Sequence, residues 1–445
     1  MKSHLWLVFG MASILFVSCG KNIDDPAPGF ENMSLANLEK GGHHPKIAVV
    51  SDIHFMHSSL LANGAVNGAA FQSYLDQDPK LLQYSSFVLQ NVIMDLKKER
   101  PDILLVPGDL TKDGEVINHE SVAGYLSQLR TLGTKVYVVP GNHDINNAKA
   151  VKYDGDNFTL LPRTTVNDFA NIYKDFGYDK TERDATSLSY LAKPYKDLWI
   201  MGIDASKYEE FGPGGDIPAG RIKSTTMTWL LAKLAEAKQQ KVTVFAMMHQ
   251  NLVEHYASQS QLDPGYVIDD WQNKANALMD AGLNVIFTGH YHANDITAYN
   301  HNGNELFDIQ TGSLVTAPMP YRLVTVKNKK LEISTKTVQT VATPMPGGLS
   351  FPAYSNLFLS QRLDNYFNSF LQNAFGAPAP VAEFASPLYR NGIMAHFAGD
   401  ERMPADQRTQ INTLGTMSEQ LAAIATILWT DLNTADNNVT IKYGK

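Results

Sequence analysis

The chain has 445 residues, of which 44% are hydrophobic and 18% are charged, as expected of a globular protein with one large core and an added part. Its 45 acidic residues outnumber its 37 basic residues, and the formal net charge is −8. This balance argues against a nucleic-acid partner, because nucleic-acid-binding surfaces cluster Lys and Arg, but it is compatible with a small phosphorylated substrate at a metal site.

The first segment in chain order is typical of an export signal. Lys2 precedes an apolar run over residues 5–17, which is too short to span a bilayer comfortably but suits a signal peptide. Cys19 is the single cysteine of the sequence and follows this run directly. Residues 16–20 resemble the lipobox of bacterial lipoproteins, and the resemblance implies cleavage before Cys19 and lipid attachment to it. An ordinary signal peptide followed by an incidental thiol is the alternative.

These features predict a signal peptide over residues 1–18 and a lipidated, polar tether over residues 19–45. We therefore expect a protein of the bacterial cell envelope that faces the periplasm or the surface. Its contact with the membrane is expected to run through the N-terminal lipid alone.

From residue 46 onward, strand-like and helix-like segments alternate. Short apolar runs rich in β-branched residues predict strands at 46–50, 103–106, 136–139, 242–248 and 284–288. A one-sided apolar pattern over 81–98 predicts a helix between the first two strands. Later runs at 306–310, 321–326 and 331–338 are typical of antiparallel closing strands. The alternation indicates a layered α/β core.

A cluster of proline and glycine at residues 344–348 predicts a domain boundary. Beyond it, apolar residues recur at helical spacing over 359–370 and 411–428. We therefore predict a main domain over residues 46–343 and a small helical C-terminal domain over residues 344–445.

Oxygen and imidazole donors follow each of the five predicted strands. In chain order they are Asp52 and His54, then Asp109, then Asn142, His143 and Asp144, then His249, and finally His290 and His292. Ligands of α/β proteins gather beyond the carboxyl ends of strands, so we expect these loops to converge on one site. Residues two apart in an extended segment point the same way, so Asp52 and His54, like His290 and His292, are expected to face one site.

In this order the donors match the motifs D-x-H, G-D, G-N-H-D, H and G-H-x-H, and the sequence resembles the calcineurin-like metallophosphoesterases over residues 47–338. The resemblance implies a four-layer αββα sandwich and a catalytic function for the main domain. Segments 108–115 and 139–147 resemble the cyclic-nucleotide-phosphodiesterase-like branch of that superfamily.

The resemblance also implies a pair of divalent cations. Such a pair clamps the attacking and leaving oxygens of a displacement and lowers the pKa of a bridging water. Carried over from the family, the first metal is held by Asp52, His54 and His292, the second by Asn142, His249 and His290, and Asp109 bridges them. Carboxylate, amide and imidazole donors without thiolates suit Mn, Fe or Zn.

His143 is expected to stay free of metal and to protonate the leaving group, with Asp144 orienting its imidazole ring. For Asp144, a role in the turn or as a helix cap is the alternative. His57, His119 and His255 lie near motifs but are predicted not to be ligands.

The predicted function is metal-dependent hydrolysis of a phosphodiester such as a cyclic nucleotide. A phosphomonoesterase or nucleotidase is the nearest alternative. A non-catalytic envelope lipoprotein that binds a phosphorylated ligand is a further one, although His143 counts against it because a binding module has no evident need for a proton donor.

One polar segment of the C-terminal domain, residues 395–401, contains His, Asp and Glu between apolar stretches. We hypothesise that it reaches over the metal site and that His396 and Asp400 contact the substrate. The alternative is a solvated loop on a domain that stabilises the core.

Overall fold

The structure is a computed structural model that describes residues 33–34, 39, 43–432 and 434–444. The predicted signal peptide and the lipidation site Cys19 lie outside the described residues. Within the described part of the chain, no helix is both long enough and apolar enough to cross a membrane.

The first sheet has six strands in the order β16-β15-β14-β1-β3-β4. Its parallel part comprises β1 (Lys46–Val49), β3 (Ile103–Pro107) and β4 (Lys135–Val139). Its antiparallel part comprises β14 (Pro320–Lys327), β15 (Lys330–Thr337) and β16 (Asn438–Lys442). The predicted strands of this sheet are confirmed, including the antiparallel closing pair.

The second sheet has seven strands in the order β12-β13-β11-β10-β9-β8-β7. They span β7 (Glu182–Arg183), β8 (Tyr190–Tyr195), β9 (Leu198–Ile203), β10 (Thr243–Met248), β11 (Val285–Thr288), β12 (Ile296–His301) and β13 (Asn304–Gln310). A separate three-stranded sheet joins β2 (Leu61–Ala62), β5 (Val151–Asp154) and β6 (Asn157–Leu160).

Strand β10 shows why the predicted runs are continuously apolar. Phe245 and Met247 pack into the core between the two sheets, whereas Val244, Ala246 and Met248 belong to the core under helices α6 (Ser224–Gln240) and α8 (Trp271–Ala281). A strand covered on both faces needs apolar side chains at successive positions.

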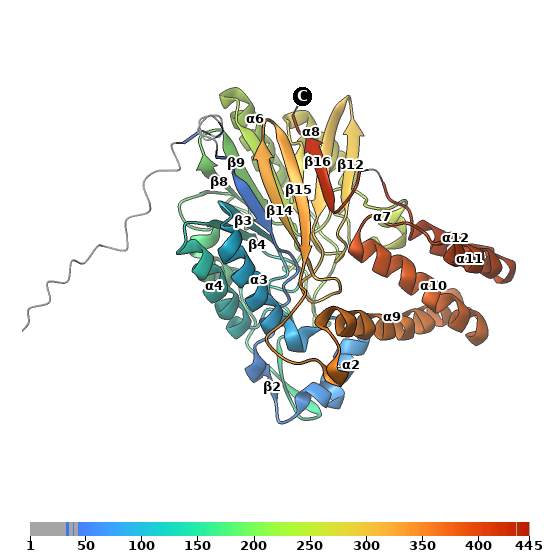
Figure 1. The fold of residues 1–445 in the computed structure, drawn as a ribbon. Coiled ribbons are helices and arrows are strands. Elements are labelled where there is room, and N and C mark those ends of the chain that lie inside the picture. Colours follow the sequence, from blue (N-terminus) through green and yellow to red (C-terminus); the bar gives the residue numbers. More distant parts are fainter. Residues whose placement is uncertain (1–32, 35–38, 40–42, 433, 445) are drawn as a thin grey trace, which may run out of the picture.

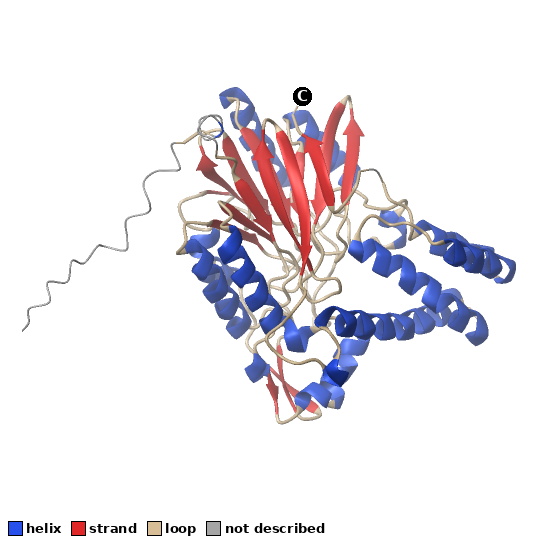
Figure 2. Cartoon of the chain, viewed as in Figure 1, coloured by secondary structure: helices blue, strands red, loops and turns tan. Residues whose placement is uncertain are grey.

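Helices α3 (Ser85–Glu99) and α4 (Val116–Arg130) cover the first sheet. With α6 and α8 on the second sheet, they complete the four-layer αββα sandwich, and the predicted fold class is confirmed (Figure 1, Figure 2). Three shorter helices lie in the connections, namely α2 (Ala69–Gln77), α5 (Val166–Ile172) and α7 (Gln259–Leu262).

The C-terminal helices form an arm that projects from the sandwich (Figure 1). We use "arm" for α9 (Phe351–Phe375), α10 (Ala379–Ala398), α11 (Ala405–Met417) and α12 (Glu419–Ile427). The apolar core of the arm, whose members include Leu359, Leu388, Leu414 and Leu421, continues into residues of the sandwich such as Tyr291. The predicted helical character of this region is confirmed.

Two details of the C-terminal region differ from the prediction. The apolar stripe over 411–428 is split at Ser418, whose hydroxyl accepts a hydrogen bond from the backbone of Leu421 and so caps α12. The chain also leaves the arm and returns to the first sheet as β16, which pairs antiparallel with β15. The segment 344–445 is therefore not helical throughout. Its last strand is short and mostly polar, and only its pairing with β15 defines it.

Candidate metal centre

The loops after β1, β3, β4, β10 and β11 meet at one edge of the sandwich, and they bring together all seven residues that the sequence predicts as metal ligands. Two groups of side chains have donor atoms within 4.8 Å of one another. The first comprises Asp52, His54 and His292, and the second comprises Asp109, His249 and His290. Asn142 adjoins the second group, with its Oδ1 lying 3.0 Å from His249 Nε2.

Asp109 lies between the two groups. Its Oδ2 is 3.5 Å from His54 Nε2 and 3.2 Å from His249 Nε2. Within the first group, His54 Nε2 is 3.2 Å from His292 Nε2, and His292 Nε2 is 3.5 Å from Asp52 Oδ1. One carboxylate thus faces imidazoles of both groups, as a bridging ligand would.

The donor set fits divalent cations. Imidazole nitrogens and carboxylate oxygens converge from opposite sides, and two imidazole nitrogens that approach to 3.2 Å share at most one proton between them. Nitrogen and oxygen donors without sulfur suit Zn, Mn or Fe. The seven residues are therefore able to hold two such ions.

Contacts behind the histidines fix which nitrogen faces the centre. His249 Nδ1 donates to the carbonyl oxygen of Pro107 at 2.9 Å, and His290 Nε2 donates to that of Gly265 at 3.1 Å. His292 Nδ1 lies 2.9 Å from Thr316 Oγ1. Each ring consequently presents its other nitrogen to the centre, which is how metal-binding histidines are held in their tautomer.

Five of the seven residues adopt a left-handed backbone conformation that is rare outside glycine. The φ angles lie between 39° and 76° at Asp52, His54, Asp109, His290 and His292. Such a conformation costs about 1–3 kcal/mol per residue and persists where the surrounding structure enforces it. Its concentration in these loops indicates a functional site, since simple connections between strands would avoid the cost.

Burial sets the charge of the ligands. Burial lowers the pKa values of His54 and His292 well below their usual range, and the positive charge of Lys80 acts in the same direction. Burial acts to raise the pKa of Asp109, but the neighbouring imidazoles, led by His249, outweigh it and hold that pKa well below its usual range. Neutral His54 and His292 and an ionised bridging carboxylate are the forms that bind metal. His249 differs, because Asp109 outweighs its burial and raises its pKa to about 9.

The sequence model of the calcineurin-like phosphoesterases matches residues 45–294, more than half of the chain. The chain belongs to this family. All seven donors, from Asp52 to His292, fall inside the matched region. Membership implies metal-dependent hydrolysis of a phosphate ester.

Two solved structures resemble this phosphoesterase at low identity. A dimetal phosphatase from Danio rerio is 12% identical, with a TM-score of 0.43, over 66% of this chain and 96% of its own. A purple acid phosphatase from seeds of yellow lupin (Lupinus luteus) is 12% identical, with a TM-score of 0.42, over 73% of this chain and 54% of its own. No curated protein sequence matches the chain.

His143 of the phosphoesterase lies beside the donors of the first group, with its ring centroid 4.9 Å from that of His54. Its Nδ1 lies 2.8 Å from Asp113 Oδ1, whereas its Nε2 is 3.2 Å from Lys80 Nζ and 3.8 Å from Asp216 Oδ2. Burial and Lys80 act to lower the pKa of His143, but Asp216, Asp109 and Asp113 outweigh them and raise it to about 9.

The predicted orienting role of Asp144 is wrong, because Asp113 occupies that place. The Asp144 carboxylate instead accepts hydrogen bonds from the backbone N–H groups of Leu110, Thr111 and Gly141, at 2.9 to 3.2 Å. It ties the turn after β3 to the turn after β4, which is the alternative structural role. Since both turns carry metal-site residues, Asp144 positions the backbone of the site and not the imidazole.

Three residues of the site were missed by the sequence analysis, namely Lys80, Asp113 and Asp216. Asp113 stands four residues after Asp109, inside a segment already matched to the family, so position alone could have suggested it. Lys80 lies in the connection between α2 and α3 and is only 4% exposed. Asp216 accepts from Asn142 Nδ2 and from Lys149 Nζ, each at 2.9 Å. Neither Lys80 nor Asp216 belongs to a recognised motif.

The other histidines near the motifs lie outside the two groups of the metal centre. His119 is fully buried, with Nε2 2.8 Å from the Asp144 carbonyl oxygen and Nδ1 3.0 Å from Tyr173 Oη. His57 is partly exposed and caps a short helical turn. His255 Nδ1 lies 2.6 Å from Asp295 Oδ1, behind the site.

The predicted substrate contacts of His396 and Asp400 are wrong. His396 lies in the last turn of α10, is 2% exposed, and packs against the rings of Tyr256 and Tyr291. Asp400 Oδ1 accepts from the backbone N–H of Asp436 at 2.9 Å. Both residues are used where the arm docks on the sandwich, so the alternative of a solvated loop does not describe them either.

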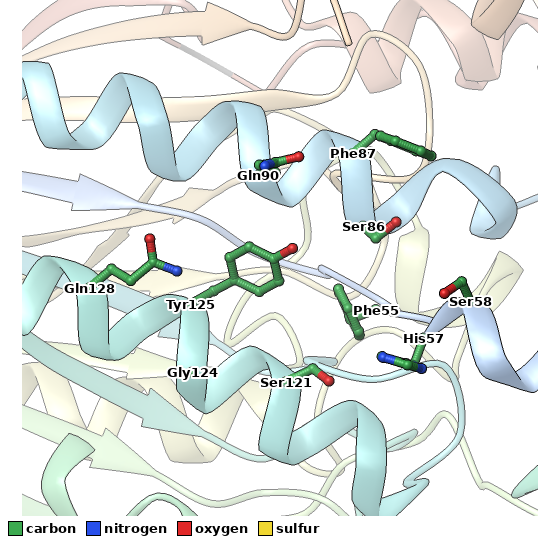
Figure 3. A pocket seen from close by; sticks show the side chains of 10 residues that line it. All are labelled: Phe55, His57, Ser58, Ser86, Phe87, Gln90, Ser121, Gly124, Tyr125 and Gln128. Atoms are coloured by element: carbon green, nitrogen blue, oxygen red, sulfur yellow. The ribbon is translucent and has the colours of Figure 1, made fainter. Parts of the chain in front are cut away.

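A cavity of about 570 Å³ lies apart from the metal centre, between α3 and α4 (Figure 3). Its walls come from the loop after β1 and from the two helices. The lining residues are Phe55, His57, Ser58, Ser86, Phe87, Gln90, Ser121, Gly124, Tyr125 and Gln128. It contains none of the predicted ligands, so we assign the chemistry to the metal centre.

Proposed function

We propose that the protein hydrolyses a phosphodiester, such as a cyclic nucleotide, at two divalent metal ions. The ions are Mn, Fe or Zn, and their proposed ligands are Asp52, His54, Asp109, Asn142, His249, His290 and His292. The observation that carries the proposal is the position of Asp109 Oδ2, within 3.5 Å of His54 Nε2 and 3.2 Å of His249 Nε2. When bound, such a pair activates a water molecule and stabilises charge on the phosphoryl oxygens.

In this proposal His143 delivers the proton to the leaving oxygen. Asp113 holds the ring through Nδ1 at 2.8 Å, so that Nε2 points to the side where Lys80 and Asp216 lie. A proton on Nε2 reaches the leaving oxygen of an ester bound over the metal ions, and general acid catalysis of this kind contributes about 10²–10⁴-fold.

The choice of a diester is supported by the charges around His143 and by the resemblance of segments 108–115 and 139–147 to cyclic-nucleotide phosphodiesterases. The carboxylate of Asp216 offsets the ammonium of Lys80, and a monoanionic diester needs less positive charge than a dianionic monoester.

A phosphomonoesterase is the second candidate, and Lys80 is the observation that favours it. Its ammonium group is buried beside His143, which is unusual for Lys, and it would neutralise the second charge of a terminal phosphate. A binding protein without catalysis has less support, because Asp113 and His143 form an oriented proton donor next to the ligands.

The experiment that tests the proposal compares bis(p-nitrophenyl) phosphate with p-nitrophenyl phosphate, using protein reconstituted with Mn²⁺ or Zn²⁺, and then extends to cyclic and linear nucleotides. A higher kcat/KM for the diester and for a cyclic nucleotide supports a phosphodiesterase. Preference for the monoester and for linear nucleotides would establish the second candidate. Binding of nucleotides without turnover, by protein with both metals bound, would establish a binding protein.

We also propose that lipid on Cys19 anchors the protein in the bacterial cell envelope, on the periplasmic or outer face. The apolar run over residues 5–17 that ends just before this single cysteine supports the proposal. The Cys19→Ser variant is expected to lose the lipid mass and to move out of the membrane fraction. Unchanged fractionation and mass would contradict it.

A further inference from the structure

A second group of imidazole and carboxylate side chains lies where the arm docks on the sandwich. We call Asp295, His396 and Glu401 the junction cluster. Asp295 precedes β12 and follows His292 by three residues, whereas His396 lies in the last turn of α10 and Glu401 lies in the loop after that helix. Their exposed fractions are 1%, 2% and 8%. The docking of the arm therefore encloses the cluster.

The three side chains point at one another. His396 Nδ1 contacts Glu401 Oε1 and lies 3.7 Å from Asp295 Oδ2, and one donor atom of each residue lies within 4.8 Å of the other two. Ligands at about 2.0–2.2 Å from a tetrahedral metal ion lie roughly 3.3–3.6 Å apart. Small side-chain movements would place the three donors at that spacing.

Each member of the cluster has a buried polar atom without a partner. Asp295 Oδ2, His396 Nε2 and Glu401 Oε2 form no hydrogen bond with any described residue. An unpaired buried polar atom costs about 1–3 kcal/mol, and more when it is charged. The other oxygen of Asp295 accepts from His255 Nδ1 at 2.6 Å, which turns Oδ2 toward His396.

Negative charge at the junction exceeds the positive charge. Burial, together with the charges of Asp295, Glu401 and Asp400, raises the pKa of Asp431 to about 6. Burial, Asp295 and Glu401 likewise raise the pKa of Asp436 to about 8, although its hydrogen bond from Asp400 acts the other way.

The cations nearest the junction balance only part of this charge. Arg322 donates to the carbonyl oxygens of Gln310, Asp295 and Asp436 and not to a carboxylate. His255 pairs with Asp295 Oδ1 at 2.6 Å, which leaves Glu401 with His396 as its one basic partner among the described residues. A divalent cation among Asp295, His396 and Glu401 would supply the missing positive charge.

We propose that the junction cluster binds a further divalent cation of the zinc type, separate from the metal centre. One imidazole and two carboxylates form a donor set that Zn²⁺ commonly uses, whereas Ca²⁺ takes six to eight oxygen ligands. The ion fixes the arm to the segment that carries His290 and His292, because Tyr291 packs its ring 5.5 Å from that of His396. Its role is structural, and the proposal does not depend on the activity assigned to the metal centre.

The test counts the Zn²⁺ ions bound by the full chain after metal removal and reconstitution, by elemental analysis of protein freed of loose metal. We expect three ions per chain in the wild type and two in Glu401→Gln and in His396→Gln. Glu419→Gln, which changes an exposed glutamate of α12, is the matched control and is expected to keep three.

A second measurement separates the two sites. Asp109→Asn disrupts the metal centre and is expected to keep the junction ion, so that Zn²⁺ still raises its Tm. In the double variant Asp109→Asn with Glu401→Gln, Zn²⁺ should no longer raise the Tm. If the wild type binds two ions and Asp109→Asn binds none, the junction site is overturned. This outcome is decisive even if Glu401→Gln does not fold, because it does not use that variant. An Asp109→Asn variant with unchanged metal content would instead contradict the proposed metal centre.

Discussion

The metal centre and the junction cluster are both buried groups of histidines and carboxylates, but they are assembled in different ways. Every donor of the centre follows a strand of one sandwich, and contacts behind the rings already fix the orientation of His249, His290 and His292. The junction joins Asp295 from the sandwich to His396 and Glu401 from the arm, and it leaves three polar atoms unpartnered. Donors that follow successive strands of one sandwich can be recognised in the sequence. Donors that come together only when the arm docks on the sandwich cannot.

The comparison predicts that the metal centre and the junction cluster can be disrupted independently of each other. Asp109→Asn removes the carboxylate shared by the two groups of the centre, and we expect kcat/KM to fall by at least about a thousandfold, because bound metals supply several kcal/mol of transition-state stabilisation. Asp406→Asn, an exposed acid on α11, is the matched control. Near-normal turnover of Asp109→Asn with both metals retained would refute the bridging role.

His143→Ala is expected to lower kcat by about 10²–10⁴-fold while both metals stay bound, because the residue acts on the substrate and not as a ligand. The loss should be smaller for esters with good leaving groups, which need less protonation. The prediction is checked by measuring turnover across a series of leaving groups. Metal content is measured on the same preparation. An equal loss for all leaving groups would mean that His143 stabilises charge or structure instead.

Asp113→Asn and Asp144→Asn distinguish a side chain that orients His143 from one that holds the turns. Asp113→Asn should lower kcat by about 10–100-fold with little change in Tm, as for other residues that orient a functional imidazole. Asp144→Asn should lower the free energy of unfolding by about 1–3 kcal/mol, because one oxygen of its carboxylate becomes a donor facing backbone N–H groups. The opposite pattern would restore the orienting role to Asp144.

An effect confined to acidic pH is expected from His119, a buried histidine that contacts Thr111, the backbone of Asp144 and the rings of Phe169 and Tyr173. Burial lowers its pKa from 6.5 to about 4, although the Asp144 carbonyl acts to raise it. Between pH 6.5 and 4 the unfolded chain therefore binds the proton and the folded chain does not, so stability is lost as pH falls through this window, by about 3 kcal/mol at most.

Denaturant unfolding of the wild type and of His119→Gln at pH 7.5 and pH 4.5 measures this contribution. The difference in the free energy of unfolding between the two proteins should shrink at the lower pH. A difference that does not change with pH would show that His119 is not held neutral by the fold.

The sequence by itself determined the layered α/β core and the convergence of the donors, and its resemblance to the calcineurin-like family added the αββα arrangement and the set of seven ligands. Strands such as β10 are apolar at successive positions because both faces are covered, and donors placed directly after such strands must lie at one edge of the sheets. The spacing of the apolar residues also predicted that the arm is helical, because the period of an amphipathic helix is set by local backbone geometry.

Only the tertiary structure decided which carboxylate holds His143. Asp144 is its neighbour in the chain, but the Asp144 carboxylate turns to the backbone, and Asp113, 30 residues away, reaches the ring. The tertiary structure also placed Lys80 and Asp216 at the centre and β16 in the first sheet. Contacts between residues far apart in the chain decide these features, and no local pattern records them. The same holds for the junction cluster, where 100 residues separate Asp295 from His396 and the docking of the arm brings them into contact.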